Sequence, residues 1–133
     1  QIGIRGAQNV SEGWDYSENA GMRVMFVEEV QKRGVDEIIE EVRFIVGDTP
    51  VYLSFDIDSL DPVFAPGTGT PEIAGLTTSE ALALIRGFRN LHYVGADMVE
   101  VSPPFDTGGI TSLTGATVMY ELLCVLAEAV SEG

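Results

Sequence analysis

Three aspartates follow an apolar segment near the middle of the 133-residue chain. The stretch SFDIDSLDPVFAPGTGTP (residues 54–71) comes directly after the apolar residues 51–53 and contains Asp56, Asp58 and Asp61. Carboxylates beside a dry core are costly unless a cation or hydrogen-bond donors compensate them. A strand that ends in this way therefore raises the question of what the carboxylates hold.

The spacing of Asp56 and Asp58 is compatible with a metal site. Residues two apart in an extended chain point to the same side, with α-carbons about 6.6 Å apart. Such side chains can converge on two ions about 3.5–4 Å apart, as in two-metal hydrolytic sites. Oxygen ligands suit Mg, Ca or Mn. The alternative, favoured for Asp61 before Pro62, is that the carboxylates accept backbone N–H groups and cap turns.

A calcium loop of the EF-hand type is excluded. Counted from Asp56, the sixth position is Asp61 rather than glycine, and the twelfth is Gly67 rather than glutamate.

The elements that must position these carboxylates alternate between strand and helix patterns. We predict strands over residues 1–5, 22–27, 51–56 and 92–101 and helices over residues 28–46, after Thr77 and over residues 110–132. Residues 7–21 are polar and rich in turn residues, which predicts a surface loop with room for one helical turn. A break is expected at Gly34, and Thr77 and Glu80 have the T-x-x-E spacing of a capping box. This alternation is typical of a parallel sheet in a three-layer α/β/α architecture, here within one domain, residues 1–133.

Apolar residues at helical spacing predict which helix faces are buried. In the helix over residues 28–46 the predicted face consists of Val35, Ile38, Ile39, Val42 and Ile45 or Val46. In the last helix it consists of Met119, Leu122, Leu123, Leu126 and Val130. Cys124, on the same helix, is expected to be a small buried side chain.

Ligands of open α/β sheets bind outside the carboxyl ends of the strands. Asp56 and Asp58 lie at that end of the third predicted strand, and Glu100 lies near that end of the fourth. Asp97 has the opposite strand parity to Glu100, so we predict a structural hydrogen bond for it. The only histidine, His92, begins the fourth strand at the other end and is interpreted as a structural or surface residue.

The composition of the chain limits the classes of molecule that it can bind. The chain has 21 acidic and 7 basic side chains and a net charge of −14, which argues against nucleic acid and anionic membranes. It has no uninterrupted run of 18 apolar residues, so we predict no membrane-spanning segment. The lone Cys124 excludes an internal disulfide and is compatible with a reducing compartment such as the cytoplasm.

Asp106 precedes the last predicted helix, and we predict that its side chain caps the start of that helix.

Two stretches, SFDIDSLDPVFAPGTGTPEIAGL and GADMVEVSPPFD, resemble the ureohydrolase family of arginase, agmatinase, guanidinobutyrase, guanidinopropionase and proclavaminate amidinohydrolase. The agmatinase-like branch is the nearer one. The resemblance spans essentially the whole chain and implies an arginase-like fold, with trimers or hexamers of the full-length enzyme. The family's segments Gly-Gly-Asp-His and Asp-Ala-His-x-Asp are not in this sequence. We therefore expect the C-terminal half of an enzyme, inactive by itself.

The resemblance implies hydrolysis of a guanidino compound, agmatine or a guanidino acid, to urea and an amine at a binuclear Mn²⁺ site. Asp56 would bridge both ions and Asp58 would bind one of them. Glu100 would accept hydrogen bonds from the substrate guanidinium, and Thr70 would steady Glu100. The metals would lower the pKa of a water molecule, so that hydroxide attacks the guanidinium carbon.

Two other functions stay open. The D-x-D pair could hold Mg²⁺ in a phosphoryl or glycosyl transferase, but the sequence has no G-x-x-x-x-G-K-[ST] cradle and its net charge would repel phosphates. A non-catalytic module, in which the acidic loop binds metal structurally or supports assembly, fits the lack of histidine ligands.

Overall fold

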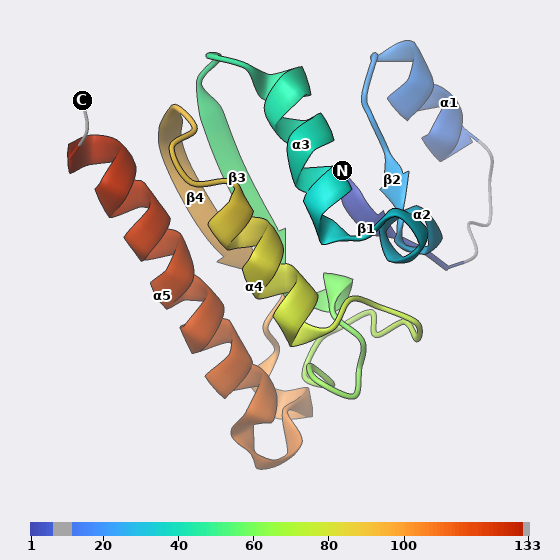
Figure 1. The fold of residues 1–133 in the computed structure, drawn as a ribbon. Helices are drawn as coiled ribbons and strands as arrows, with labels where there is room; N and C mark the ends of the chain where they lie inside the picture. Colours follow the sequence, from blue (N-terminus) through green and yellow to red (C-terminus); the bar gives the residue numbers. More distant parts are fainter. Residues whose placement is uncertain (7–11, 132–133) are drawn as a thin grey trace.

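The computed structural model describes residues 1–6 and 12–131, and strands alternate with helices along them (Figure 1). The elements are β1 (Ile2–Ile4), α1 (Glu12–Asn19), β2 (Met25–Phe26), α2 (Val27–Arg33), α3 (Val35–Val46), β3 (Val51–Asp56), α4 (Thr78–Gly87), β4 (Tyr93–Val99) and α5 (Ile110–Ser131), with 3-10 turns at Ile57–Ser59, Pro103–Phe105 and Thr107–Gly109. The predicted alternation is confirmed.

Two segments near the amino end differ from the prediction. Residues 12–19 form the eight-residue helix α1, which is longer than the single helical turn allowed for in the predicted loop, while residues 7–11 of that loop lie outside the described residues. Strand β2 has only two residues, because helix α2 begins at Val27. The predicted break at Gly34 is confirmed: its φ of 84° lies in the left-handed region that favours glycine.

The strands form two parallel pairs, β1 with β2 and β3 with β4. The predicted parallel pairing is confirmed, but the described strands do not join into one sheet. In the second pair Asp56 lies opposite Val99, so β3 and β4 end at the same edge. The loops that follow the two strands therefore emerge side by side, at the lower end of the view in Figure 1.

Helices α4 and α5 cover one face of the β3–β4 sheet (Figure 1). Leu53, Phe55 and Met98 point toward these helices and pack against the buried Val118 and Leu122 of α5. The opposite face carries the exposed side chain of Tyr52, which lies against Gly95 and donates a hydrogen bond to Asp97. The described residues thus give this sheet a helical layer on one face only.

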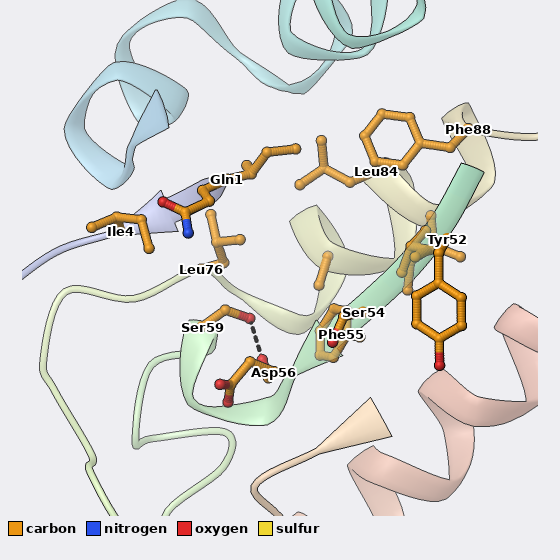
Figure 2. A pocket seen from close by; sticks show the side chains of 14 residues that line it. Gln1, Ile4, Tyr52, Ser54, Phe55, Asp56, Ser59, Leu76, Leu84 and Phe88 are labelled. Carbon is orange, nitrogen blue, oxygen red and sulfur yellow. Dashed lines mark hydrogen bonds between the residues drawn. The ribbon is translucent and has the colours of Figure 1, made fainter. Parts of the chain in front are cut away.

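A cavity of about 510 Å³ lies between β1 and β3 (Figure 2). Ile2 and Ile4 line it from one strand, Phe55 and Asp56 from the other, and Leu84 of α4 contributes to the wall. Within the described residues β1 pairs only with β2, and β3 only with β4. The cavity therefore lies between two strands, β1 and β3, that are not hydrogen-bonded to each other.

Burial confirms the predicted face of α3. Ile38 is fully buried, and Val35, Ile39, Val42 and Val46 pack against the same core. Ile45 is 53% exposed, so Val46 rather than Ile45 completes the face.

The predicted face of α5 is wrong except near Leu122. The residues of α5 that the structure buries are Thr111, Gly115, Val118, Leu122 and Val125. Met119, Leu123 and Val130 are exposed instead. Cys124 is exposed too, which corrects the predicted burial. The helix is apolar around most of its circumference, so spacing alone does not single out one stripe.

The segment Thr107–Ser131 is, by length and composition, long and apolar enough to cross a membrane. The sequence prediction missed it because serines, threonines and glycines interrupt its apolar runs. Its inner face packs against β4 and α4, and a core helix of a globular protein passes the same test. The absence of a membrane partner stays a prediction.

The capping box at the start of α4 is confirmed. Thr77 Oγ1 accepts the Glu80 N–H at 3.1 Å, and Glu80 Oε2 accepts the Thr77 N–H at 2.7 Å. In the natural protein that contains this chain, we expect Thr77→Ala to lower the free energy of unfolding by about 0.5–2 kcal/mol, because the Glu80 N–H loses its acceptor. Urea denaturation measures this change. Thr78→Ala, which removes a hydroxyl one residue later, is the control, and an equal loss in both variants would contradict the prediction.

Candidate functional site

Asp56 ends β3 and also starts the turn that follows it. Its Oδ1 accepts the backbone N–H of Asp58 at 3.0 Å, and the Ser59 hydroxyl donates to the Asp56 carbonyl oxygen at 2.7 Å (Figure 2). The chain is therefore a 3-10 turn at Ile57–Ser59 and not the extended segment assumed from the sequence. The turn fixes Asp58 relative to Asp56.

Asp56 is the carboxylate whose ionisation the fold disfavours most clearly. The pKa of Asp56 is raised to about 6: burial is the largest cause, the charges of Asp58 and Glu100 add to it, and the hydrogen bond from the Asp58 N–H opposes the shift. A raised carboxylate pKa means that the ionised form lacks sufficient compensation from its surroundings. Asp58 and Glu100 therefore lie close enough to Asp56 to repel its charge, and a bound cation would relieve that repulsion.

Glu100 follows the last residue of β4 directly and is exposed. Its φ of 68° lies in the left-handed region, which is uncommon for residues other than glycine. Backbone strain of this kind clusters at functional sites. The register of the sheet brings Glu100 to the same edge as Asp56.

Thr70 contacts a different carboxylate from the one predicted. Its hydroxyl donates to Asp58 Oδ2 at 2.8 Å, and no hydrogen bond joins it to Glu100 in the described part of the chain. A threonine hydroxyl has one proton to donate, and here Asp58 receives it. Thr70 thus orients Asp58.

The other candidate acids have structural roles. The Asp106 carboxylate accepts the N–H groups of Thr111 and Ser112 at 2.9 and 2.8 Å, as a cap of α5 should. The Ser112 hydroxyl bond is the main reason why the pKa of Asp106 falls to about 2. Asp97 accepts the Tyr52 hydroxyl at 3.0 Å. Both interpretations made from the sequence are confirmed.

The loop after β3 is braced internally and against the loop after β4. Asp61 accepts the N–H groups of Val63 at 3.0 Å and Gly75 at 3.2 Å, which is the turn role expected for it. The Ser102 N–H donates to the Gly67 carbonyl at 2.8 Å and so joins the two loops. The region around the carboxylates is therefore held by contacts between segments distant in sequence.

The carboxylates fit a divalent cation by their chemistry, but they are not a complete ligand set. Within residues 1–6 and 12–131, no group of three or more His, Cys, Asp and Glu side chains could hold a metal ion. His92 is exposed and precedes β4, at the opposite end of the strand from Glu100. Asp56 and Asp58 would therefore fit a metal site only together with ligands from outside these residues.

The sequence prediction missed Arg5. The guanidinium of Arg5 donates to the backbone carbonyl groups of Gly3, Asp58, Ser59, Leu60, Glu72 and Ile73. Carbonyl groups are present at every residue, so the sequence carried no pattern that could reveal these contacts.

Comparison with known proteins matches residues 1–125 to the Arginase family. The chain is 55% identical over 129 residues to guanidinopropionase from Pseudomonas aeruginosa, which covers 97% of this chain and 41% of that protein. It is 52% identical over 126 residues to a mitochondrial agmatinase from Gallus gallus, covering 95% of this chain and 37% of that protein.

Among solved structures, proclavaminate amidino hydrolase from Streptomyces clavuligerus matches with a TM-score of 0.91 and 46% identity over 97% of this chain and 43% of that one. This likeness confirms the predicted arginase-like α/β fold. The chain spans about two fifths of the length of the relatives it matches.

Proposed function

The chain belongs to the arginase family, and from that premise we propose that it supplies part of the catalytic centre of an enzyme that hydrolyses a guanidino compound to urea and an amine. The observation that supports this proposal most directly is the convergence of Asp56, Asp58 and Glu100 at the carboxyl ends of two adjacent parallel strands. This edge is where α/β folds bind their ligands. The raised pKa of Asp56 indicates that the cluster is complementary to positive charge.

Each residue has a proposed role. Asp56 and Asp58 would hold divalent ions through their carboxylates, and Thr70 would keep Asp58 in one orientation through its 2.8 Å hydrogen bond. Divalent ions supply a hydroxide nucleophile near neutral pH by lowering the pKa of water. Glu100 would bind the planar guanidinium through two charge-assisted hydrogen bonds and so orient its carbon. The exposed position of Glu100 leaves it open to a ligand that arrives from solvent.

Manganese is the metal we propose, since the sequence resembles a family of manganese enzymes and oxygen-rich sites suit Mn²⁺. Agmatine and short guanidino acids are the proposed substrates, because the relatives at 55% and 52% identity are a guanidinopropionase and an agmatinase. We further propose that residues 1–133 are the C-terminal part of a single domain, in an enzyme that assembles as a trimer or hexamer. The cytoplasmic location stays a prediction.

A urea-release assay tests the proposal. The natural protein that contains this chain is loaded with Mn²⁺ and incubated with agmatine, 3-guanidinopropionate, 4-guanidinobutyrate and arginine. We expect urea from at least one of the first three compounds and loss of the activity after chelation. The absence of urea from all four compounds, with protein shown to be folded and metal-loaded, would reject the catalytic reading in favour of a non-catalytic metal-binding module.

A further inference from the structure

Arg5 connects the carboxylate loop to a strand of the other sheet. It follows β1, which pairs with β2 and not with β3 in the described residues. Its Nη2 donates to the Asp58 carbonyl at 2.7 Å and to the Glu72 carbonyl at 2.6 Å, and its Nε donates to the Ile73 carbonyl at 3.0 Å. One side chain thus holds two segments of the loop that are more than ten residues apart in sequence.

The two segments held by Arg5 adjoin the hydrogen-bonded pair of Thr70 and Asp58. The first segment contains Asp58, whose own carbonyl is bound by Arg5. The second follows Thr70, whose hydroxyl donates to Asp58 Oδ2 at 2.8 Å. Because Arg5 fixes the backbone of both segments, it also fixes the distance across which Thr70 reaches Asp58.

The backbone at Gly75 leaves space for the Arg5 guanidinium. A Cβ atom on Gly75 would lie 2.8 Å from Arg5 Nη2 and 2.4 Å from the Asp61 nitrogen, so only glycine leaves room for this approach. None of the ion pairs among the described residues involves Arg5. Its planar fork of donors is used on carbonyl groups, a geometry that the single ammonium of lysine does not reproduce.

We propose that Arg5 is a positioning residue for the metal site: by holding both segments of the loop it sets the orientation in which Asp58 presents its carboxylate. This inference rests on the proposed function, because it takes Asp58 to be a metal ligand. Arg5 itself touches neither metal nor substrate. Its loss should therefore weaken metal binding while the substrate contact of Glu100, which lies on the other loop, is kept.

The test is Arg5→Lys in the natural protein that contains this chain, with Arg5→Gln as a second variant and Arg86→Lys as the control. Arg86 lies on α4 and pairs with Glu121 of α5, Nε to Oε2 at 2.9 Å, away from the loop. Three experiments are done: titration for the Mn²⁺ dissociation constant, steady-state kinetics for KM and kcat at saturating Mn²⁺, and hydrogen exchange of the backbone amides of Asp61 and Leu76 in metal-free protein. These two amides bond across the loop, to the carbonyl oxygens of Leu76 and Ser59.

We expect Arg5→Lys to weaken Mn²⁺ binding about 10- to 100-fold, the usual cost of losing a residue that orients a metal ligand. KM at saturating metal should stay unchanged, exchange at the two amides should accelerate, and Arg86→Lys should behave as wild type. Unchanged Mn²⁺ affinity in a folded Arg5→Lys protein would overturn the proposal. Weaker metal binding together with a raised KM and faster exchange throughout the protein would also overturn it, because that pattern would indicate a merely structural role.

Arg5→Gln allows the same measurements if Arg5→Lys does not fold. The side-chain amide of glutamine has two N–H donors, which can still bind the carbonyl groups of one of the two segments. A wild-type protein that binds no Mn²⁺ and releases no urea would instead reject the proposed function. In that case faster exchange at Asp61 and Leu76 would still confirm that Arg5 holds the loop, and only its link to a metal would fall.

Discussion

Asp56→Asn is expected to abolish Mn²⁺ retention and urea release together in the natural protein that contains this chain. The substitution keeps the size of the side chain and its Oδ1 acceptor for the Asp58 N–H, which lies at 3.0 Å in the wild type. It removes the negative charge that would bind the ions. Loss of an outer partner of a metal ligand costs about 10- to 100-fold, so loss of a ligand itself should cost more than that. Metal content by elemental analysis and urea release by colorimetry measure the two effects.

The same variant should make the metal-free protein more stable at pH 7–8. Burial, helped by the charges of Asp58 and Glu100, raises the pKa of Asp56 from 3.8 to about 6. A group whose pKa is raised in the folded state favours folding below its unfolded pKa and loses that contribution as the pH rises through the folded pKa. Ionised Asp56 is therefore a cost to the metal-free fold above pH 6, and asparagine removes that cost. The gain in Tm should vanish near pH 4.

Asp48→Asn is the matched control, because Asp48 is exposed in the turn before β3. It should leave metal content, urea release and the pH dependence of Tm unchanged. An Asp56→Asn protein that retains both ions and full activity would contradict the assignment of Asp56 as a ligand. The wild-type protein should also lose Mn²⁺ as the pH falls below about 6, because a proton then competes for the carboxylate.

Glu100→Gln is expected to leave the metal content intact and to weaken turnover of the guanidino substrate. Glutamine has the same length as glutamate but lacks its charge and offers one acceptor oxygen, so one of the two hydrogen bonds to the guanidinium is lost and the other no longer joins two opposite charges. Hydrogen bonds to charged groups are worth about 1.5–3 kcal/mol. This corresponds to about a 10- to 100-fold fall in kcat/KM, measured by urea release across a range of substrate concentrations.

The control for this variant is Glu40→Gln on the exposed surface of α3, which removes the same charge far from the loops. Its kcat/KM should equal that of the wild type. Loss of manganese from Glu100→Gln would show that Glu100 serves the ions and not the substrate. Wild-type kinetics in Glu100→Gln would remove Glu100 from the site.

Local signals made much of this fold predictable. Strand β3 follows from a short apolar run, the break at Gly34 from a glycine, and the start of α4 from the Thr77 and Glu80 spacing. Parallel strands that end at one edge then predicted that Asp56 and Glu100 would lie together, and the structure brings them there.

The remaining features depend on contacts between distant segments. The buried face of α5 was not predictable because apolar residues surround the helix, so the neighbouring β4 and α4 decide which of them are covered. The partner of Thr70 depends on how the loop folds back, and the sequence does not encode that path locally. The contacts of Arg5 go to carbonyl groups, which are chemically identical along the chain.

Because of the left-handed backbone at Glu100, selection for stability and selection for the proposed substrate contact would favour different residues at this position. Its φ of 68° is one that glycine adopts without penalty and that glutamate does not. A screen for thermostable variants would therefore favour glycine at this position, and the variants it enriched would have lost the carboxylate proposed to recognise the substrate. The proposed role of Glu100 in binding the substrate would account for glutamate rather than glycine at position 100, at a cost in thermal stability.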